Sequence, residues 1–455
     1  MYPLVIQGGR VVTAETSFSA DVAIQDGKIA AVGQSLVGQQ TLDASGKWVI
    51  PGGVDGHVHM QMPLAGGVRS SDDFFTGTRA AAFGGTTSIV DFVSTENGEP
   101  MMTAFDKRRA EADPLVAVDY GLHMTITPPD LDKLHEVQAA YDAGCASFKL
   151  YMAYGFYLDD GQLLQALQAI QAVGGLPVIH AENWRAIQTL NRQALAQGHT
   201  APPYHAQCRP PALEGEAVGR AIDLADYVGV PLHIFHVGCA DAIERIVAAR
   251  AKGYAVTAET CPQYLALTEA SYQREGISGA LNVCAPPLRA DDHQQATWKA
   301  LASGGLQIVT TDHCPFVMAD KQRGLDANDF TQIPGGLPGI EGRLALVYRY
   351  GVVQGILTPS QWVAACCTRP AQLFGLSNKG VIAPGYDADL VIFNPNTQWT
   401  LGLDTLHEQC DWTPYEGLEM HGKVETTLLR GQVIVHNGEY VGQRGQGRYV
   451  PRIHS

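Results

Sequence analysis

Two histidines, two residues apart, follow a short apolar segment near the beginning of the chain. His57 and His59 lie in the segment 51–60, directly after the strand-like run Lys47-Trp-Val-Ile50. In an extended chain, residues i and i+2 point to the same side, so both imidazoles can face one ion. Neutral imidazole is a good ligand for zinc-like metals. The pair is therefore a candidate metal site, although two ordinary surface or core histidines could have the same spacing.

Further polar groups stand in or just after other apolar, strand-like segments. They are Lys149, His180, His236 and Asp312. A single histidine at a strand end is more often a hydrogen-bonded core residue, and Asp312 could simply cap a turn. His233 competes with His236, but their odd spacing puts them on opposite faces and the strand-end position favours His236. Four histidines and an acid at strand ends that meet at one mouth together predict a metal centre.

Lys149 lies between Phe148 and Leu150 in a segment with little other charge. A buried ammonium group there would be costly, and burial favours the neutral amine. A neutral amine can add carbon dioxide and become a carbamate, which is a carboxylate-like anion able to bridge two metal ions. The alternative is a lysine whose long side chain carries its ammonium out of the core to the rim of the fold.

With a carbamate on Lys149, the candidate ligands divide into a set for a more buried ion and a set for a second ion. The first set is His57, His59 and Asp312. The second set is His180 and His236, and the modified Lys149 spans both ions. Nitrogen and oxygen ligands suit zinc, with manganese, iron or cobalt as alternatives.

The segments that carry these groups alternate between strand-like and helix-like patterns. The predicted strands are Thr87–Phe92, Asp119–Thr125, Ser147–Ala153, Pro177–Ala181, Pro231–Val237, Tyr254–Thr260 and Leu306–Thr311. The predicted helices include Ser71–Phe83, Leu131–Tyr141, Asp160–Val173, Gly215–Val228 and Asp241–Ala251. Counted with the opening strand at 47–50, this is an α/β chain with a (β/α)8 TIM-like barrel over residues 50–379. A doubly wound open sheet is the alternative, but no Gly-rich dinucleotide fingerprint follows any strand.

Both ends of the chain return to short strands and turns. Residues 1–49 contain an Asp26-Gly27 hairpin signal, and residues 380–443 contain a hairpin across Arg430-Gly431. Neither end has enough strands to bury a core alone, so we expect one small β-sandwich domain made from both termini, with the barrel inserted. Residues 444–455 are expected to be a C-terminal tail, either a loose end or an oligomer contact.

Composition limits the partners. The chain has 455 residues, 17% of them charged, and a formal net charge of −15, which argues against nucleic acid or an anionic membrane. No long apolar run or secretory signal pattern is present. The nine cysteines show no paired spacing, which favours reduced thiols and a cytoplasmic protein.

Several long motifs resemble those of the hydantoinases and dihydropyrimidinases, cyclic amidohydrolases of the metal-dependent amidohydrolase superfamily. They are the segments 52–59, 72–87, 148–154, 259–264, 284–289 and 311–314. The resemblance covers nearly the whole chain. It implies a binuclear metal centre with a carboxylated Lys149, a β-sandwich from both termini, and a homotetramer or homodimer.

The resemblance also implies a reaction. A metal-bridging hydroxide would open a cyclic amide, a hydantoin or a dihydropyrimidine, to an N-carbamoyl amino acid. Tyr154 would donate to the developing oxyanion, and Asp312 would take the hydroxide proton and deliver it to the leaving nitrogen. Main-chain groups at Ala285 and Gly335 would hold the substrate. The side-chain pocket would consist of Leu64, Tyr151 and Leu158.

Residue 61 bears on the substrate. Dihydroorotases carry an arginine two residues after the His-x-His pair, whereas this chain has Gln61, which argues for a neutral ring. Hydantoinases usually have aspartate there, so the chain departs from their pattern. Allantoinase is the alternative activity. A non-catalytic dihydropyrimidinase-related scaffold is disfavoured because all six candidate ligands are present, and the cyclic-amide motifs weigh against an amide or phosphoester hydrolase of the wider superfamily.

Overall fold

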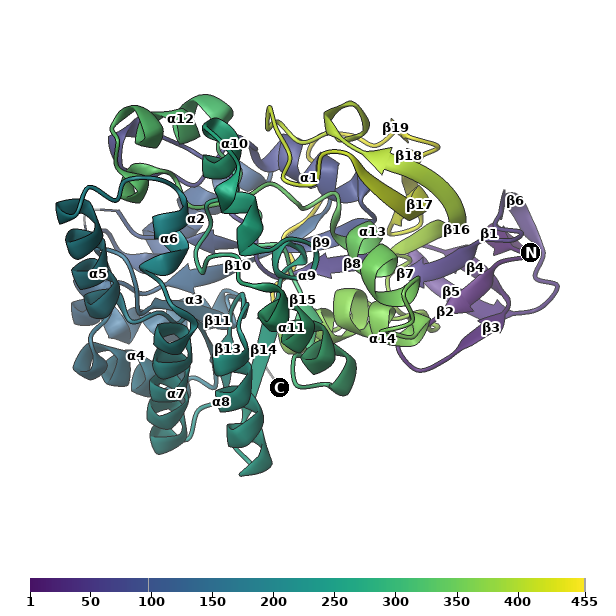
Figure 1. Ribbon diagram of the computed structural model, residues 1–455. Helices are drawn as coiled ribbons and strands as arrows, with labels where there is room; N and C mark the ends of the chain where they lie inside the picture. Colours follow the sequence, from purple (N-terminus) through teal and green to yellow (C-terminus); the bar gives the residue numbers. More distant parts are fainter. Residues whose placement is uncertain (97, 454–455) are drawn as a thin grey trace.

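Eight parallel strands run side by side in sequence order in the computed structural model, which describes residues 1–96 and 98–453 (Figure 1). The strands are β8 (Gly53–Asp55), β9 (Thr86–Val93), β10 (Asp119–Thr125), β11 (Ser147–Tyr151), β12 (Leu176–His180), β13 (Leu232–Ile234), β14 (Val256–Thr260) and β15 (Ile308–Val309). A parallel bridge between Val58 and His313 joins the two edges, so the barrel is nearly closed. The predicted TIM-like barrel is thereby confirmed.

Helices cover the outside of this barrel (Figure 1). The longer ones are α1 (Phe74–Phe83), α2 (Met101–Ala112), α4 (Asp160–Ala172), α5 (Trp184–Ala196), α7 (Pro211–Val228), α8 (Ala240–Ala251), α11 (Asp291–Ser303) and α12 (Met318–Asp326). The shorter ones are α3 (Val137–Asp142), α6 (Pro203–Gln207), α9 (Pro262–Ala266), α10 (Ile277–Ala280), α13 (Arg343–Val347), α14 (Pro359–Val363) and α15 (Arg369–Leu373).

Helix ends follow local capping chemistry. The helix predicted from Ser71 begins only at Phe74, because the Asp73 carboxylate accepts hydrogen bonds from the backbone N–H groups of Phe75 and Thr76 at 2.8 and 2.7 Å. Helix α7 ends at Val228 because the next residue, Gly229, has a φ of 76°, the left-handed conformation that glycine adopts without a steric penalty.

Two further sheets lie beside the barrel. The first has the order β5-β4-β1-β6 and consists of β5 (Lys28–Gly33), β4 (Asp21–Gln25), β1 (Tyr2–Gln7) and β6 (Gly38–Asp43). The second has the order β19-β18-β17-β16-β7-β2-β3 and consists of β19 (Glu439–Tyr440), β18 (Gln432–His436), β17 (Leu418–Leu429), β16 (Leu390–Leu401), β7 (Trp48–Pro51), β2 (Arg10–Val12) and β3 (Ser17–Ser19). Both termini contribute strands to this second sheet. Figure 1 shows the purple N-terminal strands at the right, next to the green and yellow C-terminal ones.

The two sheets share one apolar core. Ile6 and Val22 of the four-stranded sheet pack in the same buried cluster as Val49, Leu390 and Leu428 of the seven-stranded sheet. Both predicted hairpin turns are present, with positive φ at Asp26 and Arg430. The exact domain limits drawn from the sequence stay predictions.

The expectation that the segment 47–50 opens the barrel is wrong. Strand β7 pairs with β16 and β2 in the seven-stranded sheet, and the first barrel strand is β8. Gly52 makes the change of sheet feasible: a Cβ at this position would lie 2.1 Å from the Thr87 hydroxyl oxygen, so only glycine fits. The Gly52 N–H donates to Asp389 O at 2.8 Å, which attaches the connection between β7 and β8 to the residue preceding β16 of the seven-stranded sheet.

The expectation of a loose C-terminal end is also wrong for residues 444–453, while 454–455 lie outside the described residues. Tyr449 forms a parallel bridge with Tyr120 at the beginning of β10. The Arg452 guanidinium is buried at the amino ends of the barrel strands, where it donates to Ser147 Oγ at 2.8 Å and to the carbonyl oxygen of Leu122. The tail therefore closes the end of the barrel opposite the predicted site.

An apolar cluster lies in the barrel interior below the predicted site. Val54, Val90, Val178, Phe235 and Ile308 form one buried cluster with neighbours from α15. Across residues 1–96 and 98–453, no helix combines the length and the apolar character needed to cross a bilayer.

Candidate metal centre

Five of the predicted ligands bring their imidazole and carboxylate atoms together at the carboxyl ends of the barrel strands. His57 Nε2 and His59 Nε2 each lie 3.1 Å from Asp312 Oδ1. On the other side of the site, His180 Nδ1 lies 2.9 Å from His236 Nε2. These contacts group the side chains in the same way as the two predicted ligand sets, whose role in metal binding stays a prediction.

The two sets adjoin one another. Ligand atoms of His57, His236 and Asp312 all lie within 4.8 Å of each other, and the rings of His57 and His236 are 5.4 Å apart. The competing His233 is not one of these grouped atoms: its Nδ1 lies 2.8 Å from Thr257 Oγ1 and its Nε2 lies 3.2 Å from Glu259 Oε2.

Several residues of the site have an unusual backbone conformation. Gln61, Tyr154, His236 and Asp312 have positive φ values of 51°, 72°, 40° and 52°. Residues other than glycine adopt this region at a cost of about 1–3 kcal/mol, and such residues concentrate at functional sites. The turns after the strands thus direct these side chains toward the barrel mouth at the expense of local strain.

The tautomers of two histidines favour metal binding. His57 Nδ1 lies 2.6 Å from Glu259 Oε1, and His180 Nε2 lies 2.7 Å from Glu182 Oε2. A carboxylate holds the proton on the nitrogen facing it, which leaves the lone pair on the other nitrogen for a ligand. His57 Nε2 is buried and has no hydrogen-bond partner within the described chain. An unsatisfied imidazole nitrogen beside a carboxylate and further imidazoles is the donor set of a divalent metal site.

Lys149 lies inside the barrel, only 1% exposed. Its Nζ is 4.1 Å from the centre of the Phe235 ring and 4.7 Å from that of Tyr151. Burial lowers the pKa of Lys149 to about 7, although the charges of Asp312 and Glu259 partly oppose the shift. The environment thus favours the neutral amine that carbamate formation requires.

The two predicted catalytic groups have opposite protonation states. Burial opposes ionisation of Asp312, but His57 and His59 together hold the pKa of its carboxyl well below the usual value. Burial raises the pKa of Tyr154 well above its usual value, so its hydroxyl keeps the proton. The Tyr154 ring lies 5.1 Å from that of His180. Asp312 can therefore accept a proton while Tyr154 can donate a hydrogen bond.

The predicted substrate contacts lie in two places. A Cβ built on Gly335 would be 3.9 Å from the Ala285 nitrogen, so these two main-chain segments are neighbours. Tyr151 faces the site, with its ring 6.1 Å from that of His180, and its carbonyl accepts from the Leu158 N–H at 2.9 Å. Leu64 packs against the cluster of Val68, Cys314 and Phe316, close in sequence to Asp312.

Sequence reasoning missed the carboxylates that orient the histidines. Glu259 lies in a recognised motif, and Glu182 is two residues after His180, yet neither received a role. Arg209 was missed as well; its Nη1 lies 2.7 Å from Glu182 Oε2. A carboxylate at the end of an apolar strand was an available signal for Glu259, whereas nothing in the sequence points to Arg209.

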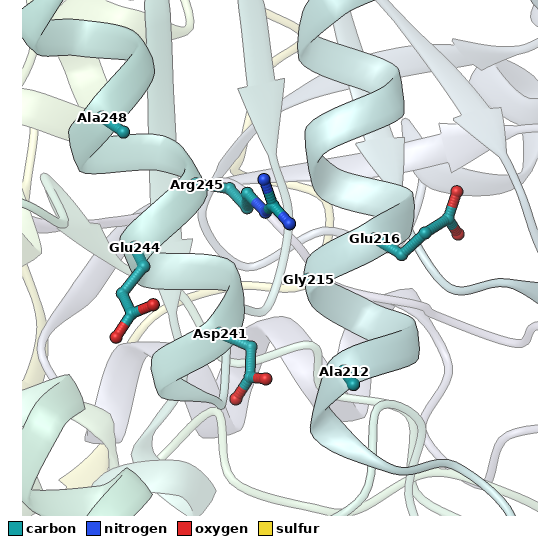
Figure 2. A pocket seen from close by; sticks show the side chains of 7 residues that line it. All are labelled: Ala212, Gly215, Glu216, Asp241, Glu244, Arg245 and Ala248. Atoms are coloured by element: carbon teal, nitrogen blue, oxygen red, sulfur yellow. The ribbon is translucent and has the colours of Figure 1, made fainter.

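A separate cavity of about 450 Å³ lies on the outside of the barrel between α7 and α8. Figure 2 shows Arg245 extending from α8 toward α7 across this space. The lining residues are Ala212, Gly215, Glu216, Asp241, Glu244, Arg245 and Ala248. None of them is a predicted site residue, so this groove is not part of the candidate centre.

Comparisons with known proteins agree with this geometry. The model of the amidohydrolase family matches residues 48–434. A D-hydantoinase of Streptomyces coelicolor is 44% identical over 98% of this chain and 97% of its own length.

Solved structures give the same result. The D-hydantoinase from a Bacillus sp. AR9 superposes with a TM-score of 0.96 at 44% identity, with 99% of both chains covered. The dihydropyrimidinase from Brevibacillus agri NCHU1002 gives a TM-score of 0.96 at 43% identity, with 99% of this chain and 98% of that chain covered. This chain therefore belongs to the amidohydrolase family and, within it, to the hydantoinase and dihydropyrimidinase group.

Proposed function

We propose that this protein hydrolyses a carbon–nitrogen bond in a cyclic ureide, opening a hydantoin or a dihydropyrimidine to an N-carbamoyl amino acid. The observation that carries the proposal is the convergence of His57, His59, His180, His236 and Asp312 at one barrel mouth in a chain of this family. The full-length similarity to D-hydantoinases supports the same reaction class.

The donor set fits two divalent ions, zinc by preference, with manganese, iron or cobalt as alternatives. His57, His59 and Asp312 would hold the more buried ion, His180 and His236 the other, and a carbamate on Lys149 would contact both. Ions in such a centre lower the pKa of water and polarise a carbonyl oxygen.

Two side chains of the protein transfer the proton and stabilise the oxyanion. Asp312 takes a proton from the attacking water and returns it to the ring nitrogen when the carbon–nitrogen bond breaks, serving first as base and then as acid. The Tyr154 hydroxyl donates a hydrogen bond to the oxygen that gains charge when the carbonyl carbon is attacked.

Recognition combines main-chain groups with an apolar pocket. The backbone at Ala285 and Gly335 meets the polar edge of the ring, and Leu64, Tyr151 and Leu158 receive the exocyclic substituent. Gln61 carries no charge, which favours a neutral ring over dihydroorotate. The D-hydantoinase names of several relatives support a preference for the D enantiomer.

A substrate panel tests the function. The metal-replete enzyme is incubated with hydantoin, both enantiomers of a 5-substituted hydantoin, dihydrouracil, allantoin and dihydroorotate, and ring opening is followed for each. We expect the highest kcat/KM with hydantoins or dihydrouracil. A clear preference for allantoin would favour the allantoinase alternative, and no turnover of any ring would refute the proposal.

The cysteines bear on the cellular setting of the protein. All nine cysteines are buried free thiols, which supports a reducing compartment such as the cytoplasm. A homotetramer or homodimer is expected by analogy with the family, and light scattering of the purified protein measures the molar mass directly.

A further inference from the structure

Lys321 on α12 is a fully buried lysine that the proposed reaction does not use. It is 0% exposed, and its Nζ donates to Val283 O and to Gly336 O, both at 2.8 Å. It forms no ion pair with any carboxylate in the described part of the chain. The ring of Trp412 lies 5.5 Å from the same nitrogen.

The two carbonyls that Lys321 binds adjoin the main-chain segments proposed to hold the substrate. Val283 is two residues before Ala285, and Gly336 directly follows Gly335. The Gly336 N–H also donates to Val283 O at 3.0 Å, so one carbonyl joins both segments and Lys321.

Neighbouring carbonyls are occupied as well. Cys284 O accepts from His205 Nε2 at 2.8 Å, and Pro286 O accepts from the Tyr264 hydroxyl at 2.7 Å. Within residues 1–96 and 98–453, the main-chain N–H and C=O groups of Ala285 and Gly335 have no hydrogen-bond partner. The surrounding contacts thus fix the segment while leaving the proposed substrate-binding groups available.

We propose that Lys321 is a positioning residue for substrate binding, which holds the main chain of residues 283–285 and 335–336 at the spacing that a cyclic ureide requires. This inference rests on the proposed function. A lysine without a carboxylate partner is a costly group to bury, and carbonyl hydrogen bonds are what compensate for it. Burial lowers the pKa of Lys321 to about 7, yet the amine donates to both carbonyls in either protonation state.

The test replaces Lys321 in the metal-replete enzyme by methionine, which keeps the length but has no N–H, and by glutamine, which keeps a donor. Hydantoin is the substrate, and metal content is measured in parallel. We expect Lys321→Met to raise KM about ten-fold, because Gly336 O loses its side-chain donor and Val283 O loses one of its two donors. We expect kcat and metal content to stay near the wild-type values, and Lys321→Gln to be intermediate in KM.

Arg323→Met is the matched control, since Arg323 lies on the same helix with a side chain that is 61% exposed. It should leave KM unchanged. An unchanged KM in a folded Lys321→Met enzyme would overturn the proposal. So would parallel loss of kcat and metal, or failure of both Lys321 variants to fold, because either result would assign Lys321 to general stability. Failure of the proposed function is distinguishable, since the wild-type enzyme itself would then open no ring.

Discussion

His57 Nδ1 lies 2.6 Å from Glu259 Oε1, although 202 residues separate the two in the sequence. The carboxylate is completely buried and also faces His233 through its other oxygen. Burial opposes its ionisation, but His57 and His233 lower the pKa of Glu259 to about 2, so it is charged at neutral pH. Glu182 has the corresponding place beside His180, which gives each proposed metal position its own orienting carboxylate.

This arrangement predicts that a mutation can weaken the binding of one proposed ion without weakening the binding of the other. In Glu259→Gln the amide still fits the space but no longer holds the proton on His57 Nδ1 by charge. We expect metal affinity at the more buried position to fall about 10–100-fold. Chelator titration with elemental analysis should show one ion leaving early and the other retained as in the wild type.

Glu182→Gln is the matched comparison, and it should instead lower the metal affinity of the proposed position formed by His180 and His236. The two variants should therefore differ in which ion is lost, as read by exchange with a spectroscopically visible ion such as cobalt. Equal loss of both ions in each variant would contradict the prediction that each carboxylate supports the binding of only one ion.

Replacement of Lys149 by alanine should remove both the bridge and the activity. We expect less than two ions per chain and activity near background, because the carbamate on Lys149 is the group proposed to contact both ions. Intact-mass measurement under native conditions should show the wild-type chain heavier by one carbon dioxide and the variant without this addition. Lys107→Ala, with a side chain 63% exposed, is the surface control. A fully active Lys149→Ala enzyme would rule out the carbamate.

The two proposed roles of Asp312, metal ligand and base, can be tested separately. Asp312→Asn keeps an oxygen that can bind metal but cannot take a proton, so we expect kcat to fall about 10²–10⁴-fold with much of the metal retained. Asp312→Ala loses both and should be nearly inactive with less metal. The ratio of activity to bound metal is the measurement, and an asparagine variant with near-normal kcat would refute the role as base.

The barrel, and the gathering of polar side chains at its carboxyl end, were predictable because their signals are local. Apolar runs define the strands, as in β10, whose predicted limits Asp119–Thr125 are those of the structure. The chemical groups at the strand ends follow from the geometry of a parallel barrel. The segment 47–50 was assigned to the wrong sheet because an apolar run predicts a strand but not its pairing partner.

The residues that orient the site were not predictable, because a sequence pattern does not show which distant groups a side chain will meet. Glu259 and Lys321 act on groups that only the folded chain brings near them. Arg452 belongs to a polar tail without apolar periodicity, and its partners, Ser147 and the Leu122 carbonyl, lie more than 300 residues earlier. Hydrogen bonds to carbonyls leave no pattern in the sequence of the segment that accepts them.

The C-terminal tail, residues 444–453, should contribute to the stability of the barrel. Arg452 fills the amino end of the barrel with its guanidinium, and Ser147 Oγ, which accepts from it, also lies 2.5 Å from His123 Nδ1. Arg452→Ala removes the buried donor to Ser147 Oγ and to the Leu122 carbonyl oxygen, which should lower stability by roughly 2–4 kcal/mol and reduce the midpoint of thermal unfolding by several degrees. Arg448→Ala is the control, because its side chain is exposed and only its backbone N–H binds Asp119. Equal midpoints for the two variants, measured by calorimetry at the same metal occupancy, would show that the tail does not brace the barrel.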